Sequence, residues 1–458
     1  MRGRARGNQR LSASEVSALI GAMRSEPVAE IEPPAKVEVP RARFDTSFES
    51  LPGYQAMRMQ RLVGEAAGIR NPYYRMHEAR SGATAIIDGK PVVNFASYDY
   101  LGLNGHPEIA AAVAEAAATW GTSVSASRIT AGERPLHREL EAALAAVYQV
   151  DDAVVFVSGH ATAVSALGAL MGPRDLVIHD ALIHNCIVVG ARLSGATRRL
   201  FPHNDLDMLE EILAAERGRY ERVLIATEGL FSMDGDGPDL ARLIDIKEHF
   251  GCWLLVDDAH GLGVLGRTGL GIAEHAGIDP RKVDIWLGTL SKALVSCGGY
   301  VAGSHALVDF LKFAASGMVY SVGMSMPATV ASLKALDLMR REPARVQRLQ
   351  ENSHVFHRRA RERGFDVGPS WGYGILPLII GDTLRTVLLA ERLLARGINA
   401  VPVLPPGVPE RSARLRFFVL ASHSRDQIEQ ALAATRDELD ALERAGVGVN
   451  SLSDLVRS

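Results

Sequence analysis

The sequence predicts an α/β protein with a large domain, built on a mostly parallel central sheet, and a smaller C-terminal α/β domain. From about residue 90, short apolar runs alternate with helical stretches. The runs are continuously apolar, as expected of parallel strands that are covered on both faces. The repeated order of strand and helix favours a parallel sheet, and the pattern changes after about residue 335, where a second domain is expected.

Each expected strand of the large domain is a short run of large apolar residues. We expect these strands at 154–157, 176–178, 223–226, 253–256 and 283–287. Helices are expected between them at 161–171, 206–216 and 240–250. In the C-terminal domain we expect one long polar helix at 335–363, strands at 375–380 and 415–419, and further helices at 386–396 and 426–445.

The length of 458 residues allows two or three packed domains. We expect a flexible N-terminal extension at 1–50, an arm and small-domain segment at 51–95, the large domain at 96–335 and the small domain at 336–458. The extension contains a possible short helix at 12–23 and a linker rich in proline and charge at 31–40. It is either a mobile tail or a docking element for a partner.

Composition excludes several classes of protein. The net charge of −3 does not indicate a nucleic-acid or membrane partner. No apolar run reaches the ~18 residues that span a bilayer, and the basic N-terminus lacks the apolar stretch of a secretory signal. The three cysteines have no metal-ligand spacing, so we expect no metal site and a reducing, cytoplasmic location.

Polar residues and glycines follow several of the predicted strands, which is where open α/β sheets bind ligands. Ser158, Gly159 and His160 stand between a strand and a helix, and a glycine there lets backbone N–H groups approach a phosphate. A tight turn is the alternative explanation. Glu228 and Ser232 follow the third strand, as a carboxylate and a hydroxyl that a ligand would meet.

The last two strands of the large domain carry the most specific signal. Asp257 ends a buried strand, where a carboxylate is costly unless it is satisfied by a helix cap, a salt bridge or a protonated pyridine nitrogen. Lys292 stands 35 residues further on, next to a strand end and to Thr289, which is placed to contact phosphate. A desolvated lysine has a lowered pKa and becomes a nucleophile for an aldehyde. Together these residues predict pyridoxal phosphate (PLP) bound to Lys292.

Seven motifs, which lie in order along most of the chain, extend this prediction to a family. The chain resembles the α-oxoamine synthases, a branch of the fold type I PLP-dependent transferases that includes 8-amino-7-oxononanoate synthase and serine palmitoyltransferase. The motifs are NFASYDYLGL (94–103), SVSASRITAGERPLHRELE (123–141), HDALIHN (179–185), TEGLFSMDGD (227–236), DDAHGLGVLG (257–266), GTLSKALVSCGGY (288–300) and ARLRFF (413–418).

The resemblance implies a role in catalysis or binding for individual residues. Lys292 would hold PLP as a Schiff base and act as the base at the substrate α-carbon. Asp257 would pair with the ring nitrogen and His184 would stack on the ring. The implied contacts to the ring 3-oxygen are His260 and Ser232, those to the phosphate are Gly159, His160 and Thr289, and further cofactor contacts are Ser158 and Glu228. Tyr98 and Arg416 would bind substrate, with Arg416 on the amino-acid carboxylate and Arg414 as the neighbouring alternative.

The resemblance also implies the reaction, a decarboxylative condensation in a homodimer. A small amino acid (glycine, alanine or serine) and an acyl thioester would give an α-amino ketone, a thiol and CO2. The motif style and the extended N-terminus are nearest to polyketide-associated members, which take the acyl group from an acyl carrier protein. The alternatives are an acyl-CoA enzyme, a PLP aminotransferase, or a non-catalytic subunit, which should lack Lys292.

Overall fold

The computed structural model of the chain describes residue 14, residues 46–66 and residues 68–448. Two compact units divide the chain, at 1–59 and 60–458. The first contains the short helix η1 (Phe48–Ser50), and helix α2 (Pro52–Ala66) crosses the boundary. Apart from Ser14, the predicted helix at 12–23 and the linker at 31–40 lie outside the described residues. Among the described residues, no helix combines the length and apolar character that crossing a membrane requires.

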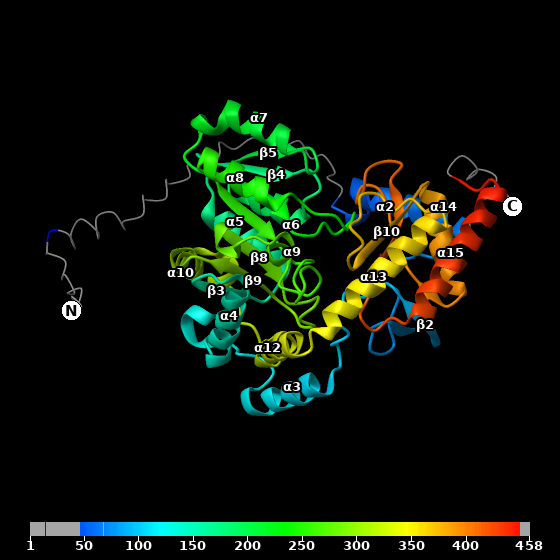
Figure 1. Cartoon of the computed structure of the whole chain (residues 1–458), viewed down its shortest axis with the longest axis horizontal. Helices are drawn as coiled ribbons and strands as arrows, with labels where there is room; N and C mark the ends of the chain where they lie inside the picture. The colour runs from blue at the N-terminus through cyan, green and yellow to red at the C-terminus, as the bar shows by residue number, and fades with distance from the viewer. Residues whose placement is uncertain (1–13, 15–45, 67, 449–458) are drawn as a thin grey trace. The chain divides into compact units, whose positions relative to one another are not determined.

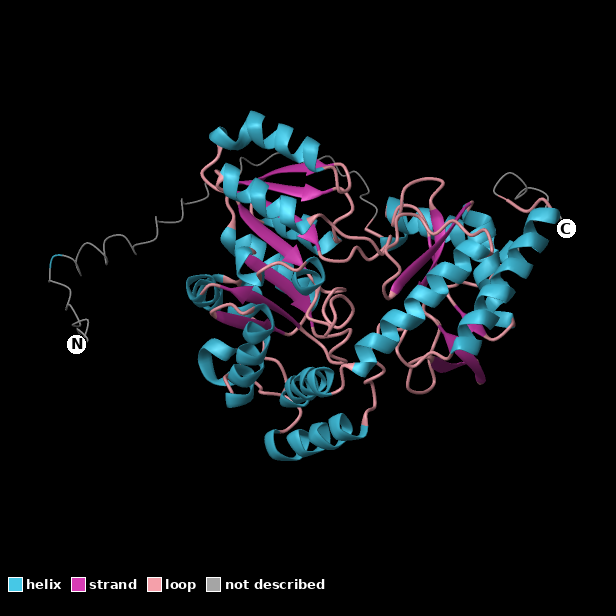
Figure 2. Cartoon of the chain, in the orientation of Figure 1, coloured by secondary structure: helices cyan, strands magenta, loops and turns pink. Residues whose placement is uncertain are grey.

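The second unit contains a seven-stranded sheet in the order β3-β9-β8-β7-β6-β4-β5 (Figures 1 and 2). The strands β4 to β8 run parallel, and β9 is antiparallel to both of its neighbours. The strands are β3 (Asp152–Phe156), β4 (Leu176–Asp180), β5 (Thr197–Phe201), β6 (Val223–Glu228), β7 (Trp253–Asp257), β8 (Ile285–Thr289) and β9 (Gly299–Gly303). The predicted mostly parallel sheet is confirmed.

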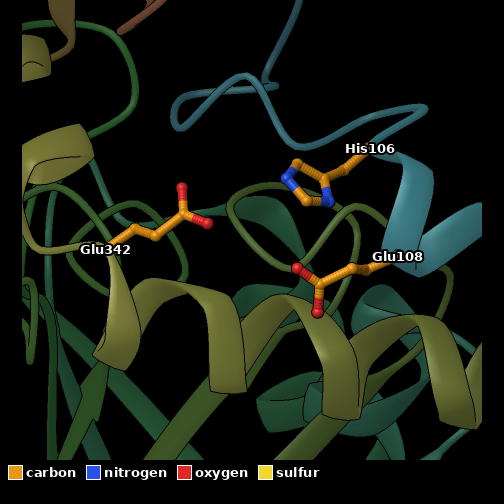
Figure 3. A group of neighbouring side chains, drawn as sticks. All are labelled: His106, Glu108 and Glu342. Carbon is orange, nitrogen blue, oxygen red and sulfur yellow. The ribbon is translucent and has the colours of Figure 1, made fainter.

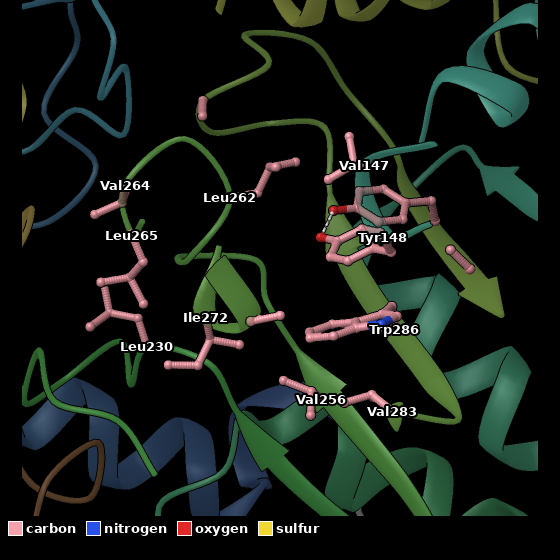
Figure 4. Packing of buried hydrophobic residues seen from close by; sticks show 14 of the residues in the cluster. Val147, Tyr148, Leu230, Val256, Leu262, Val264, Leu265, Ile272, Val283 and Trp286 are labelled. Carbon is pink, nitrogen blue, oxygen red and sulfur yellow. Dashed lines mark hydrogen bonds between the residues drawn. The ribbon is translucent and has the colours of Figure 1, made fainter. Parts of the chain in front are cut away.

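Apolar side chains cover both faces of this sheet, which explains the continuous apolar runs. On one face Trp286 stacks on Tyr148 at 4.6 Å between ring centroids, and the Tyr148 and Tyr300 hydroxyls lie 2.7 Å apart (Figure 4). The helices of this part are α3 (Pro107–Trp120), α4 (Pro135–Tyr148), α5 (Gly159–Leu170), α6 (Asn185–Leu193), α7 (Leu206–Glu216), α8 (Leu240–Phe250), α9 (Ile272–Ala276), α10 (His305–Ala314), α11 (Ser316–Val319) and α12 (Met326–Arg341).

The smaller C-terminal region has an antiparallel sheet in the order β10-β13-β12, with its own apolar core. Its elements are β10 (Ile375–Gly381), β12 (Val401–Val403), β13 (Ala413–Phe418), α13 (Ala344–Glu362), α14 (Thr383–Ala395) and α15 (Arg425–Arg444). A third sheet joins β1 (Thr84–Ile87), β2 (Lys90–Asn94) and the C-terminal β11 (Ile398–Asn399). The α/β prediction for this region is confirmed.

Several details differ from the predictions. The single helix expected at 335–363 is wrong: α12 ends at Arg341 and α13 begins at Ala344, because Pro343 has no N–H to continue the helix. The fifth predicted strand begins two residues later, at Ile285. Strands β5 and β9 were not predicted, since β5 reads TRRLF at the sheet edge and β9 reads GYVAG.

Candidate active site

A cavity of about 290 Å³ lies where the carboxyl ends of the parallel strands of the large sheet meet. Nine of the predicted residues line it, and they are Ser158, Gly159, His160, His184, Glu228, Asp257, His260, Thr289 and Lys292. They come from the ends of β3, β6, β7 and β8 and from the turn after β4. The structure therefore brings together residues that are up to 134 positions apart, from Ser158 to Lys292.

One end of this cavity is suited to an anion. Ser158 caps α5, since its hydroxyl accepts a hydrogen bond from the Ala161 N–H at 3.3 Å, and Gly159 is the first helical residue. A Cβ at Gly159 would lie 2.8 Å from the Thr289 Oγ1, so only glycine leaves this space open. Backbone N–H groups at a helix N-terminus beside a threonine hydroxyl are the donors that a phosphate requires.

The other end contains three ionisable groups whose burial is only partly compensated. Burial raises the pKa of the Asp257 carboxyl, although the Lys292 ammonium opposes the shift and the Ala259 N–H donates to Asp257 Oδ1 at 3.0 Å. Burial and the charge of Asp257 raise the pKa of Glu228. Burial lowers the pKa of Lys292, against the attraction of both carboxylates. Shifts of this kind gather at reactive sites.

Two histidines complete the walls. His184 is the N-cap of α6, where its Nδ1 accepts from the Cys186 N–H at 3.3 Å and lies 3.0 Å from the Cys186 Sγ. His260 Nδ1 lies 2.8 Å from the Tyr100 hydroxyl. Burial lowers the pKa of both rings. Cys186 and Tyr100 were not predicted as partners of these histidines, although Tyr100 lies in the YDYLGL motif and Cys186 stands two residues after His184.

The predicted substrate residues lie beside this cavity. Tyr98 lines an adjoining cavity of about 420 Å³ that shares Lys292 with the first. Arg416, on β13, donates to the backbone carbonyl of the buried Ser232 at 2.8 Å. Its guanidinium lies 4.7 Å from the Phe418 ring centroid, and its buried Nε has no partner among the described residues.

The neighbouring arginine has different partners. Arg414 Nη1 donates to Asp234 Oδ1 at 2.5 Å and to the Met233 carbonyl at 3.1 Å. Its charge is therefore satisfied within the protein, whereas burial lowers the pKa of Arg416, which has no carboxylate partner among the described residues. Arg416 is accordingly the better placed of the two for a substrate carboxylate.

The residues that line the site fit pyridoxal phosphate. The cofactor has a phosphate, an aldehyde and a pyridine nitrogen, and the cavity has a helix N-terminus, a lysine and a buried carboxylate. The Glu228 Oε1 is buried and has no partner among the described residues, so the polar lining is incomplete without a ligand. The polar lining thus matches all three functional groups of PLP.

Within the described residues, one group of side chains outside the cavity is close enough together to be considered as a metal site. Ligand atoms of His106, Glu108 and Glu342 lie within 4.8 Å of one another (Figure 3). Each carboxylate is paired with an arginine at 2.6 Å, Glu108 with Arg341 and Glu342 with Arg345. Because both negative charges are already neutralised, we assign no metal to this group.

Comparison with known proteins agrees with this geometry. The family model described as "Aminotransferase class I and II" matches residues 90–434. The 8-amino-7-oxononanoate synthase of Symbiobacterium thermophilum is 40% identical over 377 residues, which cover 81% of this chain and 96% of that protein. The Sphingomonas wittichii serine palmitoyltransferase superposes with a TM-score of 0.83 at 27% identity, covering 87% of this chain and 99% of that one.

A second serine palmitoyltransferase, from S. paucimobilis and holding a PLP–myriocin aldimine, superposes with a TM-score of 0.82 at 25% identity over 87% of this chain and 99% of that one. Sequence and structure thus identify the same group of enzymes, and the match extends over both the large sheet and the C-terminal region. The resemblance seen in the seven motifs is confirmed. The chain belongs to the α-oxoamine synthases, PLP-dependent C-acyltransferases with the aminotransferase class I and II fold.

Proposed function

We propose that this chain condenses a small amino acid (glycine, alanine or serine) with an acyl thioester, releasing CO2 and a thiol and forming an α-amino ketone. The observation that carries the proposal is the position of Lys292. Its side chain lines the cavity that contains Asp257 and Glu228, and it also lines the adjoining cavity that contains Tyr98. Family membership indicates the reaction type, and the site residues supply the roles.

Each end of the main cavity would bind a different part of PLP. Bound PLP supplies an aldehyde for Lys292 and a ring that withdraws electrons from the substrate α-carbon. Asp257 would hold the ring nitrogen, while the N-terminus of α5 and the Thr289 hydroxyl would hold the phosphate. His184 would cover one face of the ring, and His260 and Ser232 would approach the ring hydroxyl.

Lys292 and Arg416 act on the amino acid. Arg416 binds the substrate carboxylate through its guanidinium fork. Lys292 Nζ removes the α-proton, because burial lowers its pKa and increases the fraction of free amine near neutral pH. The carbon that loses the proton attacks the thioester carbonyl and expels the thiolate, which takes up a proton. The carboxylate then leaves as CO2, and a proton returns to the α-carbon to give the α-amino ketone.

The acyl thioester has room beside Lys292. The 420 Å³ cavity with Tyr98 also contains Asp99 and Asn104, and both residues line a further cavity of about 840 Å³. We propose that the thioester arm enters by this route. We further propose that the acyl group comes from a carrier protein, that residues 1–45 assist its docking, and that the enzyme works as a cytoplasmic homodimer.

Two measurements test these proposals. Purified holoenzyme is given each amino acid with one acyl group, presented on CoA or on its carrier, and CO2 and ketone are quantified. Stoichiometric CO2 and α-amino ketone are expected, and a keto acid without CO2 would identify an aminotransferase instead. Faster turnover with the carrier, reduced by deleting residues 1–45, is expected; equal turnover with CoA and no effect of the deletion contradicts the carrier proposal alone.

A further inference from the structure

His203 bridges two buried carboxylates outside the cavity. Its Nδ1 lies 2.9 Å from Asp180 Oδ1 and its Nε2 lies 2.9 Å from Asp236 Oδ2. The side chains are 21%, 0% and 6% exposed, in the order His203, Asp180, Asp236. Ionised carboxylates only accept hydrogen bonds, and an imidazole donates from both nitrogens only when it is protonated. Burial alone would lower the pKa of His203, but the hydrogen bonds and charges of the two aspartates outweigh it and raise the pKa to about 10, so the ring is a cation at neutral pH.

The Asp180 end of the bridge leads to His184. Asp180 is the last residue of β4, and its Oδ1 also accepts from the Leu182 N–H at 2.8 Å. Its Oδ2 accepts from the Asn204 N–H at 2.8 Å. The first of these bonds holds the turn between β4 and α6, whose N-cap is His184, and the second joins the end of β4 to the chain that follows β5.

The Asp236 end leads to Arg416. Asp236 closes a tight loop, in which its carbonyl accepts from the Phe231 N–H at 2.8 Å. Ser232, inside this loop, presents the carbonyl that accepts from Arg416 at 2.8 Å. Asn204 Nδ2 reinforces the connection by donating to Asp236 Oδ2 at 3.1 Å.

Among the described residues, no lysine or arginine forms an ion pair with Asp180 or Asp236, so His203 is their one cationic partner there. From β4 it faces Asp180, and from the loop it faces Asp236. Phe231 packs edge-on against the ring at 4.5 Å between centroids, and the neighbouring Asn204 is neutral. A neutral ring would donate to only one carboxylate and leave the other buried without its cation.

We infer that His203 is a positioning residue, whose bridge between Asp180 and Asp236 fixes the loop carrying Ser232 and thereby orients Arg416 for the amino-acid carboxylate. His203 does not line the cavity and touches none of the residues proposed to react. The inference rests on the proposed role of Arg416. It adds a polar connection, outside the cavity, between the turn that holds His184 and the strand that holds the substrate arginine.

The kinetic test compares His203→Gln with wild type as PLP-saturated enzymes. Glutamine keeps one donor and removes the charge, so Arg416 loses its fixed position. We expect the KM for the amino acid to rise at least fivefold, with kcat within twofold and cofactor absorbance retained. The ratio of the two KM values should fall towards one as pH rises through about 10, since wild-type His203 then loses its charge as well.

The matched control is His305→Gln, which alters an exposed histidine 3.5 Å from Asp152 and should leave both constants unchanged. An unchanged KM in His203→Gln, with or without a lower Tm, means a merely structural role and overturns the inference. If that variant does not fold, Asp236→Asn is measured instead; the KM should rise likewise, and an unchanged KM again refutes the inference.

A second readout does not depend on the reaction. In protein labelled with ¹⁵N in histidine, the His203 ring of wild type should show two protonated nitrogens at pH 8, with His203→Gln identifying its signals. A neutral ring at pH 8 overturns the inference whatever the enzyme catalyses. A doubly protonated ring in a protein that performs no condensation would instead mean that the proposed function has failed.

Discussion

The two ends of the large sheet differ in whether their charged side chains are paired with opposite charges. At the amino ends of β7 and β8 lies a cavity of about 630 Å³, which is larger than the one at the carboxyl ends. Charges around it are paired: Arg281 binds Asp279 at 2.8 Å and Lys247 binds Asp284 at 3.1 Å. At the carboxyl ends, Lys292 and its two carboxylates are buried with shifted pKa values.

Cavity size therefore does not identify the reactive end of this sheet. Charges that are paired and at least partly exposed cost little and contribute little, whereas buried charges without full compensation cost stability. A protein retains such a cost where it serves binding or chemistry. The comparison predicts that equivalent substitutions at the two ends will have unequal effects on activity.

The largest difference is expected between the two lysines. Lys292→Ala should lower kcat at least about 1000-fold, because it removes the base and the amine that binds the cofactor aldehyde. Lys247→Ala, at the amino end, should leave kcat within twofold. Steady-state rates with cofactor absorbance provide the measurement, and near-normal turnover of Lys292→Ala would contradict the proposed site.

The two aspartates should differ by a smaller factor. Asp257→Asn should lower kcat about 100-fold, because an amide cannot pair ionically with a protonated ring nitrogen. Asp284→Asn removes the partner of Lys247 and weakens an acceptor of the Leu254 N–H, so it should lower Tm without lowering kcat. Rates and thermal unfolding are measured on both variants. Equal loss of activity in Asp257→Asn and Asp284→Asn would contradict the proposed difference between the two ends of the sheet.

Much of the site could be predicted because parallel strands bring distant residues to one edge. Asp257 and Thr289 are the last residues of their strands and Lys292 follows three residues after β8, so their meeting follows from topology alone. Apolar character also located most strands of the large sheet. The polar edge strand β5 and the glycine-rich β9 lack that signal, and β9 depends on contacts such as the close approach of Gly299 to Gly159.

The contacts between the large and small sheets could not be predicted. The carbonyl of Ser232 meets Arg416 across 184 residues, and nothing in either local sequence specifies that hydrogen bond. The same holds for His203, whose two partners lie on different elements. Such contacts depend on how helices and strands pack against one another, so neither hydrophobic periodicity nor motif spacing can predict them.

The two arginines provide a narrower comparison. Arg416→Lys should raise the KM for the amino acid about tenfold, since a lysine replaces a bidentate fork with a point charge. Arg281→Lys, at the amino end, retains a surface cation beside Asp279 and should change neither KM nor kcat. Initial rates over a range of amino-acid concentrations measure this. A tenfold loss in kcat with unchanged KM would contradict the binding role of Arg416.

The smallest effect is expected on the pH dependence of stability, at two aspartates whose pKa values are shifted in opposite directions. Burial raises the pKa of Asp99, beside the Tyr98 cavity, to about 6, whereas bonds from Arg281 lower the pKa of Asp279 to about 2. A raised carboxyl pKa means that folding favours the proton, so the stability contribution of Asp99 is present below about pH 4 and lost as pH rises to 6. A lowered pKa has the opposite sign, so the contribution of Asp279 is present above about pH 4 and lost as pH falls to 2.

Thermal unfolding between pH 4 and 6 measures the difference. A two-unit shift at Asp99 corresponds to roughly 3 kcal/mol, or about 3 °C in Tm for a chain of this length. Part of this shift lies outside the range from pH 4 to 6, so relative to wild type Asp99→Asn should gain about 2 °C over it, whereas Asp279→Asn should keep a constant offset there. Parallel Tm curves for wild type and Asp99→Asn would show that the carboxyl end does not penalise this charge, and the contrast between the two ends would then be confined to Lys292 and its partners.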